Sequence, residues 1–206
     1  MKRAAASPQP PVSSPLPPPR VLGIDPGLNV TGYGVLEVAV GGPKVCEAGV
    51  IRGRSRGSLA ARLADIHGDL AELIAMLRPS VMAVEQLYSH YKRPRTAILM
   101  GHARGVICLA AAQAGLPVVS YASTRVKKTL TNHGRATKVQ MQKAVQRELR
   151  LPKLPEPHDV GDALAVALCH YYAQSDWAAL ARAPKVKPQA LFLPPQPPAP
   201  SPESPT

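Results

Sequence analysis

The chain has 206 residues, with a formal net charge of +12, 24 prolines and three cysteines. This length suffices for one hydrophobic core of ordinary domain size, and no apolar run approaches the roughly 20 residues that a membrane-spanning helix needs. Lys2 and Arg3 are not followed by an apolar signal-peptide core, and the cysteines form no CxxC pair. The composition therefore argues against a secreted, disulfide-bonded or membrane-spanning protein and predicts a cytoplasmic one with reduced thiols.

Both ends of the chain are rich in proline: residues 1–19 contain seven and residues 183–206 contain nine. Such segments cannot bury enough apolar surface to offset the entropy lost on ordering. We therefore expect disordered tails at 1–19 and 177–206, with one folded domain at 20–176; a Pro-rich ligand for a partner domain is the alternative. The domain keeps 20 basic and 12 acidic residues, a net charge of +8. That charge favours a polyanionic partner, although a solvated basic surface is also common.

Between the tails, strand patterns alternate with helical ones. The predicted strands are 21–25, 32–38, 44–51, 81–85 and 116–121, of which the second and third form a hairpin. The predicted helices are 58–77, with Ser58 as its N-cap, 95–114, ending at Gly115, and three more near 123–131, 137–149 and 157–174. This alternation predicts an α/β fold in which helices flank a mixed five-stranded sheet.

Four acidic residues stand at the ends of these elements. Asp25 ends the first strand, and Glu85 ends the otherwise wholly apolar strand "VMAVE". Asp159 and Asp162 are three residues apart, which places them on one face at the start of a helix. In open α/β sheets, ligands gather beyond the carboxyl ends of the strands. The four carboxylates would converge there if the strands of Asp25 and Glu85 are neighbours.

Each acid alone has a simpler explanation. An Asp after a strand is usually a turn former, and Asp159 and Asp162 could cap a helix and complement its dipole. Four neighbouring carboxylates, however, repel one another unless cations lie between them. Hard ions such as Mg²⁺ prefer oxygen ligands, and two such ions clamp the attacking and leaving oxygens of a phosphoryl displacement. The pattern thus predicts two divalent ions, with the nearby glycines Gly32 and Gly34 letting the hairpin turn beside Asp25 without side-chain bulk.

The stretches "LGIDPGLNVTGYGV", "AVEQLY" and "HDVGDALAVALCH", in this order and spacing, resemble the RuvC family of Holliday-junction endonucleases over roughly residues 20–175. The resemblance implies a ribonuclease-H-like fold, a homodimer, and resolution of four-way DNA junctions by paired symmetric nicks with Mg²⁺ or Mn²⁺. A branch-migration motor is a candidate further partner. The catalytic and metal-binding acids of the family fall on Asp25, Glu85, Asp159 and Asp162. Because the third ligand is His in some relatives, His158 is a rival, but the spacing of three to Asp162 selects Asp159.

Two basic segments suit a DNA substrate. The first, "SHYKRPR" at 89–95, follows Glu85 closely, and the second is "RVKKTLTNHGRATK" at 125–138. By resemblance, Lys127 and Lys138 match lysines important for DNA binding and catalysis, and Tyr88 matches an aromatic that stacks on opened bases. The alternatives are a solvated helix face and a plain core aromatic. The predicted DNA-binding residues are Tyr88, Lys92, Arg93, Arg95, Arg125, Lys127, Lys128, Arg135 and Lys138, of which Lys127 is also a catalytic candidate.

Three other classes of protein share parts of this pattern. Sugar-kinase and actin-like ATPases need a second domain and more glycine-rich phosphate loops, for which the chain has no room. A ribonuclease-H-like nuclease that acts on structured RNA is the closest alternative. A catalytically inactive DNA-binding module is disfavoured because all four acids are present.

Two further expectations concern the dimer and the histidines. The helix at 95–115 is the candidate dimer interface, because its small residues Ala97, Gly101 and Gly105 would let two helices approach closely. The alternative is that these residues pack the helix on its own sheet. His133 and His170, like His90, are expected at surface or capping positions.

Overall fold

The computed structural model describes residues 18–39, 41–53, 57–87 and 94–174. Its strands are β1 (Arg20–Asp25), β2 (Val30–Ala39), β3 (Gly42–Arg52), β4 (Val81–Glu85) and β5 (Val118–Tyr121). Its helices are α1 (Leu59–Leu77), α2 (Pro94–Gln113), α3 (Ser123–Thr131), α4 (Lys138–Glu148) and α5 (His158–Ala173). The predicted tails lie outside the described residues, apart from Pro18 and Pro19.

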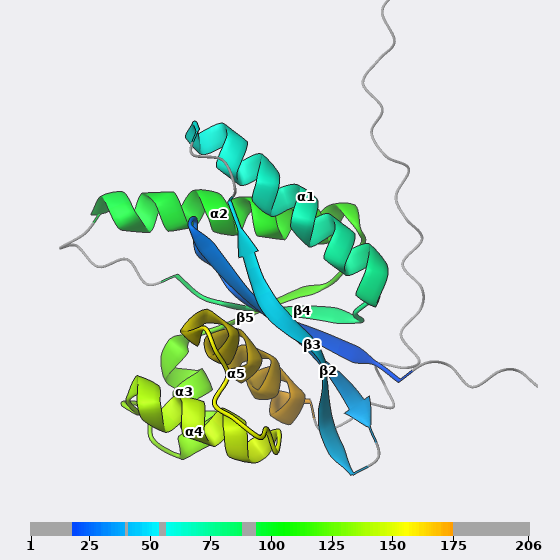
Figure 1. Ribbon diagram of the computed structural model, residues 1–206, viewed down its shortest axis with the longest axis vertical. Helices are drawn as coiled ribbons and strands as arrows, with labels where there is room; N and C mark the ends of the chain where they lie inside the picture. Colours follow the sequence, from blue (N-terminus) through cyan, green and yellow to red (C-terminus); the bar gives the residue numbers. More distant parts are fainter. Residues whose placement is uncertain (1–17, 40, 54–56, 88–93, 175–206) are drawn as a thin grey trace, which may run out of the picture.

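The expected mixed five-stranded sheet with helices on both faces is confirmed. Helices α1 and α2 cover one face, and α3, α4 and α5 cover the other (Figure 1). The strand order is β3-β2-β1-β4-β5, in which β1 pairs antiparallel with β2 and parallel with β4. Ile24 on β1 stands opposite Val84 on β4. The next residues, Asp25 and Glu85, therefore end adjacent strands at the same edge of the sheet.

The side chains of the central strands alternate between two hydrophobic cores, as the period of two along a strand requires. On β4, Val81 and Ala83 pack under α3, α4 and α5, whereas Met82 and Val84 pack under α1 and α2. Because both of its faces are covered, β4 is apolar along its whole length up to Glu85, which is the pattern of a strand buried on two sides. No helix in the described ranges is both long and apolar enough to cross a membrane.

The glycines of β1 and β2 allow α5 to lie directly on the backbone of the sheet. A Cβ atom on Gly23 would lie 2.2 Å from the carbonyl oxygen of Ala163, and one on Gly32 would lie 2.0 Å from that of Asp159. The expectation that Gly32 helps the hairpin to turn is wrong, because this residue lies inside β2 opposite Asp25. Its missing side chain instead makes room for the first turn of α5.

The boundaries of the elements follow from local capping. Ser58 is the N-cap of α1, as predicted, and its hydroxyl accepts a hydrogen bond of 3.3 Å from the Ala61 amide. The strand predicted to begin at residue 116 begins instead at Val118. Leu116 belongs to the C-terminal cap of α2, since its amide donates to the Ala111 carbonyl at 2.9 Å, next to Gly115 with φ of +64°.

The expectation that His170 lies at the surface or at a cap is wrong. Its side chain is 1% exposed, and its Nδ1 lies 2.9 Å from the hydroxyl oxygen of Tyr121 at the end of β5. Burial lowers the pKa of His170, which favours the neutral imidazole. This polar pair thus joins α5 to the sheet inside the core, whereas His133 is exposed as expected.

The close packing of α5 predicts that Gly23→Ala destabilises the fold by about 1–3 kcal/mol, the usual cost of forcing extra volume into a packed core. The added methyl group meets main-chain atoms of α5, which cannot yield as a flexible side chain could. Gly68→Ala, in α1 with open space around the new Cβ, is the control and should stabilise by about 0.5–1 kcal/mol. Urea denaturation of both variants measures the two changes, and equal effects would contradict the explanation.

Candidate active site

A cleft of about 720 Å³ opens at the edge of the sheet where β1 and β4 end. Three of the four predicted acids line it: Asp25 from β1, Glu85 from β4 and Asp162 from α5. The lysines Lys127 and Lys138 line the same cleft from α3 and α4. The structure therefore brings together side chains from five separate elements, at the position that the carboxyl ends of neighbouring strands predict.

The fourth acid, Asp159, lies beside the cleft rather than among its lining residues. It belongs to the first turn of α5, whose main chain packs on Gly32, the residue paired with Asp25. Its charge raises the pKa of Asp25 and that of Asp162, so it acts on the same electrostatic site. His158 also acts on Asp162, in the opposite direction, by lowering its pKa.

Burial and mutual repulsion make the carboxylates difficult to ionise together. Burial, followed by the charges of Glu85, Asp162 and Asp159, raises the pKa of Asp25 from its ordinary 3.8 to about 7. Burial is also the largest cause of the raised pKa values of Glu85 and Asp162. These acids therefore need either protons or cations at neutral pH.

The chain supplies part of that compensation itself. Lys127 and Lys138 lower the pKa values of Glu85 and Asp162, and Lys138 also lowers that of Asp25. The hydroxyl of Ser123, the first residue of α3, hydrogen-bonds the carboxylate of Glu85 and lowers its pKa as well. Two lysines and one hydroxyl still leave the pKa of each of the three acids above its ordinary value.

The donor set fits hard divalent cations. Carboxylate oxygens are the ligands that Mg²⁺ and Mn²⁺ prefer, and the raised pKa of Asp25 shows that the site favours added positive charge. Within residues 18–39, 41–53, 57–87 and 94–174, no three acidic, His or Cys side chains are gathered into a preformed cage. Three of the acids instead line a shared cleft and the fourth lies beside it; the residues available to hold metal are Asp25, Glu85, Asp159 and Asp162.

The predicted DNA-binding residues divide into three groups. Lys127 and Lys138 line the cleft, whereas the remaining described ones are exposed on α2, on α3 and in the loop between α3 and α4. The guanidinium of Arg125 lies 5.1 Å from the centre of the Tyr121 ring, a cation–π contact that orients it at the surface. The exposed residues are Arg95, Arg125, Lys128 and Arg135. Tyr88, Lys92 and Arg93 lie outside the described residues.

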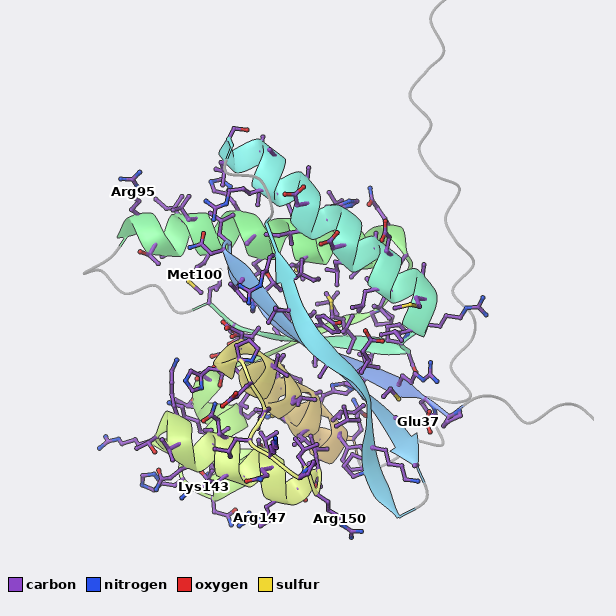
Figure 2. The ribbon with its side chains drawn as sticks, in the orientation of Figure 1. Glu37, Arg95, Met100, Lys143, Arg147 and Arg150 are labelled. Atoms are coloured by element: carbon purple, nitrogen blue, oxygen red, sulfur yellow. The ribbon has the colours of Figure 1, made fainter. Side chains whose placement is uncertain are left out.

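Sequence reasoning missed a second group of cations on the outer side of α4. Figure 2 shows Lys143 and Arg147 along this helix, on the side away from the sheet, and Arg150 just beyond the end of the helix, where it lines a hollow with residues of β3. The unit formed by residues 123–150 contains eight basic residues and one acidic residue, so it carries +7 of the +8 charge of the 20–176 domain. The available signal was this local charge excess, which extends past the segment 125–138 singled out from the sequence.

Two positions on α2 were also missed as parts of the site. Ala97 and Met100 line the cleft opposite α3 and α4, and Met100 and Arg95 are labelled on this helix in Figure 2. The apolar wall that they form carried no signal in the sequence, because Ala and Met in an Ala- and Gly-rich helix are typical of a core.

Most of the chain matches a known protein family. The family described as "Crossover junction endodeoxyribonuclease RuvC" matches residues 21–170. The crossover junction endodeoxyribonuclease RuvC of Rhodopirellula baltica is 58% identical over 154 residues, which cover 74% of this chain and 85% of that protein. This chain belongs to the RuvC family.

Solved structures of RuvC agree with this assignment. The Thermus thermophilus RuvC structure is similar with a TM-score of 0.69 at 32% identity, covering 79% of this chain and 96% of that one. Thermus thermophilus RuvC in complex with a Holliday junction substrate gives a TM-score of 0.69 at 33% identity, covering 75% of this chain and 94% of that one.

The comparisons confirm the family resemblance, the fold and the enzyme class. The chain is a RuvC-type endodeoxyribonuclease, and dependence on divalent metal ions is typical of that family. The family and the relatives named above are junction endonucleases, and they give no support to the alternative of a nuclease for structured RNA.

The raised pKa of Asp25 predicts how the stability of the metal-free protein depends on pH. Because the folded pKa of about 7 lies above the ordinary 3.8, folding favours the protonated acid, and the stability from this group is lost as pH rises through 7. Between pH 5 and pH 8 in EDTA, the free energy of unfolding should fall by on the order of 2–3 kcal/mol through Asp25 alone.

Asp25→Asn should flatten that slope and make the protein more stable than wild type at pH 8, as measured by urea denaturation. Glu72→Gln, which removes an exposed carboxylate on α1, is the control and should leave the slope unchanged. Mg²⁺ should raise the melting temperature of wild type more at pH 8 than at pH 6. A pH-independent stability in wild type would contradict this account.

Proposed function

We propose that this RuvC-family chain resolves four-way DNA junctions as a homodimer, with two Mg²⁺ or Mn²⁺ ions in each active site. The observation that carries the proposal is the joint placement of Asp25, Glu85, Asp162 and two lysines in one cleft at the ends of β1 and β4. Asp159 completes the acidic set from the adjoining turn of α5. The solved RuvC complex with a Holliday junction substrate supports the choice of DNA substrate.

Each group has a distinct role in phosphodiester hydrolysis. When bound, the divalent ions would supply an activated water and stabilise charge on the attacking and leaving oxygens. The four acids would hold these ions, and Asp25 would be the central ligand, because its charge interacts with those of the other three acids. Lys127 and Lys138 face the same space, where they neutralise charge that develops on the scissile phosphate. This arrangement needs no covalent nucleophile, and the products carry 5′-phosphate and 3′-hydroxyl ends.

The positive charge of the α3–α4 unit directs the DNA toward the cleft. Its net charge of +7 surrounds an acidic site that would otherwise repel phosphates. Exposed cations continue from the cleft along the outer side of α4 to Lys143 and Arg147. We assign the cleft lysines to the scissile phosphate and the outer cations to the adjoining duplex arm.

The dimer supplies two active sites for the two cuts that a junction requires. On α2, Gly101 and Gly105 have open space where a side chain would begin, so they do not pack this helix on its own sheet. Ile98 and Leu109 lie on the same exposed side and are 62% and 50% exposed. Ala97 lines the cleft instead. We therefore place the partner copy on the exposed stripe of α2 formed by Ile98, Gly101, Gly105 and Leu109.

Two further expectations concern a second partner and the location of the protein in the cell. A branch-migration motor stays a prediction from the sequence. A cytoplasmic location is supported by Cys46, Cys108 and Cys169, which are all free thiols.

A cleavage assay tests the substrate and the acids together. With Mg²⁺ or Mn²⁺, the protein should cut a mobile four-way junction and leave a plain duplex and a structured RNA intact. Asp25→Asn and Glu85→Gln should each reduce cleavage by at least about 10³-fold, because a lost ligand disrupts the two-ion clamp, while junction binding persists on the basic surface. Loss of binding together with cleavage, in a variant whose circular dichroism is unchanged, would contradict the metal assignment.

Sedimentation equilibrium with and without junction DNA tests the dimer. Wild type should be dimeric, and Gly105→Glu should be monomeric and lose paired nicking, because it places a charge at the centre of the α2 stripe. Gly68→Glu is the matched control, since its Cβ also meets open space on a helix. A wild-type monomer that makes paired nicks would overturn the dimer, and a dimeric Gly105→Glu would move the interface elsewhere.

A further inference from the structure

Arg104 of α2 joins the ends of two strands that border the active site. Its Nη1 donates a hydrogen bond of 2.8 Å to the main-chain carbonyl of Glu85, the last residue of β4. Its Nη2 donates one of 2.7 Å to the hydroxyl oxygen of Ser120 on β5. The guanidinium thus spans β4 and β5 at the edge of the sheet where they enter the cleft.

The hydrogen bonds of Arg104 lie at the last residue pairs of the β4–β5 ladder. Val84 pairs with Ser120 and Glu85 pairs with Tyr121, which is the last pair of the β4–β5 ladder. Beyond it, the amide of Gln86 donates to the Tyr121 carbonyl at 2.9 Å. A strand end is the part of a ladder that opens most readily, and here it carries a carboxylate of the site.

The side chain and the main chain of Glu85 are held from different elements. The hydroxyl of Ser123 on α3 hydrogen-bonds its carboxylate, and Arg104 on α2 holds its carbonyl. The same side of α2 contributes Met100, one turn earlier, and Ala97 to the wall of the cleft. The helix that lines the site therefore also fixes the backbone from which a metal-binding acid projects.

We infer that Arg104 is a positioning residue that sets the location of the Glu85 carboxylate in the active site through its fork to the Glu85 carbonyl and Ser120. The inference rests on the proposed role of Glu85 as a metal ligand. The planar guanidinium supplies two donor nitrogens at fixed spacing, whereas a lysine at this position would have to serve both acceptors from a single nitrogen. Displacement of a site group by about 1 Å can cost on the order of 10²-fold in rate.

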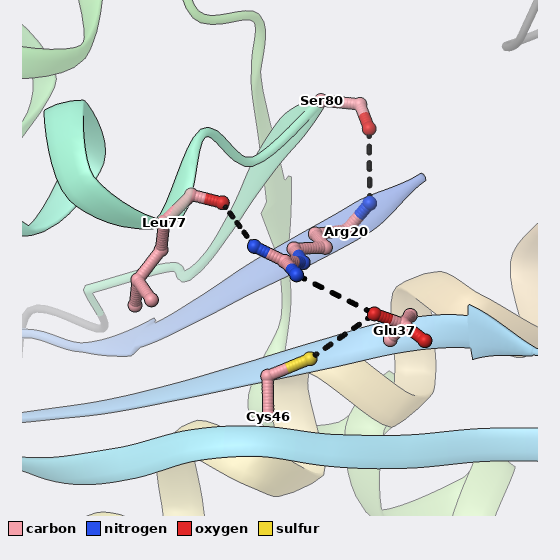
Figure 3. Close-up of polar contacts among 5 residues, drawn as sticks. All are labelled: Arg20, Glu37, Cys46, Leu77 and Ser80. Atoms are coloured by element: carbon pink, nitrogen blue, oxygen red, sulfur yellow. Dashed lines mark hydrogen bonds and ion pairs between the residues drawn. The ribbon is translucent and has the colours of Figure 1, made fainter. Parts of the chain in front are cut away.

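A second arginine of the sheet provides a matched control. Arg20, at the start of β1, donates from Nη1 to the Leu77 carbonyl at 3.0 Å, and its Nη2 lies 3.5 Å from Glu37 (Figure 3). Like Arg104, it is half-buried and ties a strand end to another element. It does so at the opposite end of the sheet, so its loss should affect stability without affecting the site.

The test uses the full chain with Arg104→Gln, Arg104→Lys, Ser120→Ala and Arg20→Gln. The first readout is amide hydrogen exchange of Gln86 in the metal-free protein, which should be about tenfold faster in Arg104→Gln, the factor expected for loss of a charged hydrogen bond. The second is the Mg²⁺ concentration for half-maximal cleavage, which should rise by about 10–100-fold, as for other groups that orient metal ligands. Junction affinity measured in EDTA should stay within about twofold, because the lysines of the basic surface are untouched.

The other variants distinguish positioning from general stability. Arg104→Lys and Ser120→Ala should fall between wild type and Arg104→Gln in both readouts, and Ser120→Ala keeps the test available if the arginine variants fail to fold. Arg20→Gln should lower the melting temperature and change neither readout. If Arg104→Gln and Ser120→Ala behave like Arg20→Gln, the inference is overturned. If wild type does not cleave junctions, the proposed function fails, while the exchange of Gln86 still decides the role of Arg104.

Discussion

The close contact between α5 and the backbone of β1 and β2 is the constraint on which the rest of this structure depends. Gly23 and Gly32 have no room for a Cβ because carbonyl groups of α5 lie at those positions. This contact places the first turn of α5, with Asp159 and Asp162, at the edge of the sheet where Asp25 ends β1. A helix held at the ordinary distance of a side-chain layer could not bring its acids to the strand end.

The same packing buries several carboxylates close together, where they repel one another. Burial helps to fix the positions of the acids, but it also raises their pKa values, most clearly that of Asp25, to about 7. Lys127 and Lys138 relieve part of the repulsion and leave the remainder for bound cations. Repulsion among fully ionised acids destabilises the folded protein, so binding of divalent ions between them would increase its stability. In the function that we propose, the basic α3–α4 unit serves two purposes: its positive charge attracts phosphate, and it supplies the two lysines of the cleft.

Helix α2 combines three functions on three of its sides. One side packs on the sheet and α1 through residues such as Ala103 and Ile107. A second lines the cleft and carries Arg104, which holds the end of β4. The third exposes Gly101 and Gly105, to which we assign the partner copy. The helix contains no acidic residue and only two arginines, of which Arg104 serves the second of these sides.

The sequence by itself determined the elements and the sheet class, and it singled out the acids that we propose for the site. Period-two and helical apolar patterns are local signals, and a carboxylate at the end of an apolar strand, as in "VMAVE", is conspicuous because burial of a charge is costly. Lys127 and Lys138 were singled out by resemblance to a family; the match over residues 21–170 confirms the family, and the roles of the two lysines stay predictions. Local capping chemistry likewise fixed the start of α1 at Ser58.

Only the tertiary structure decided the roles of several residues whose contacts lie far away in the sequence. Gly32 reads as a turn residue in sequence, and its true role depends on a helix that begins 126 residues later. His170 reads as a surface residue until its partner Tyr121, 49 positions earlier, is known. Arg104 gives no signal within its own helix, because both of its acceptors belong to other elements. Contacts of this kind join residues far apart in the chain, so their energies depend on packing that no local pattern encodes.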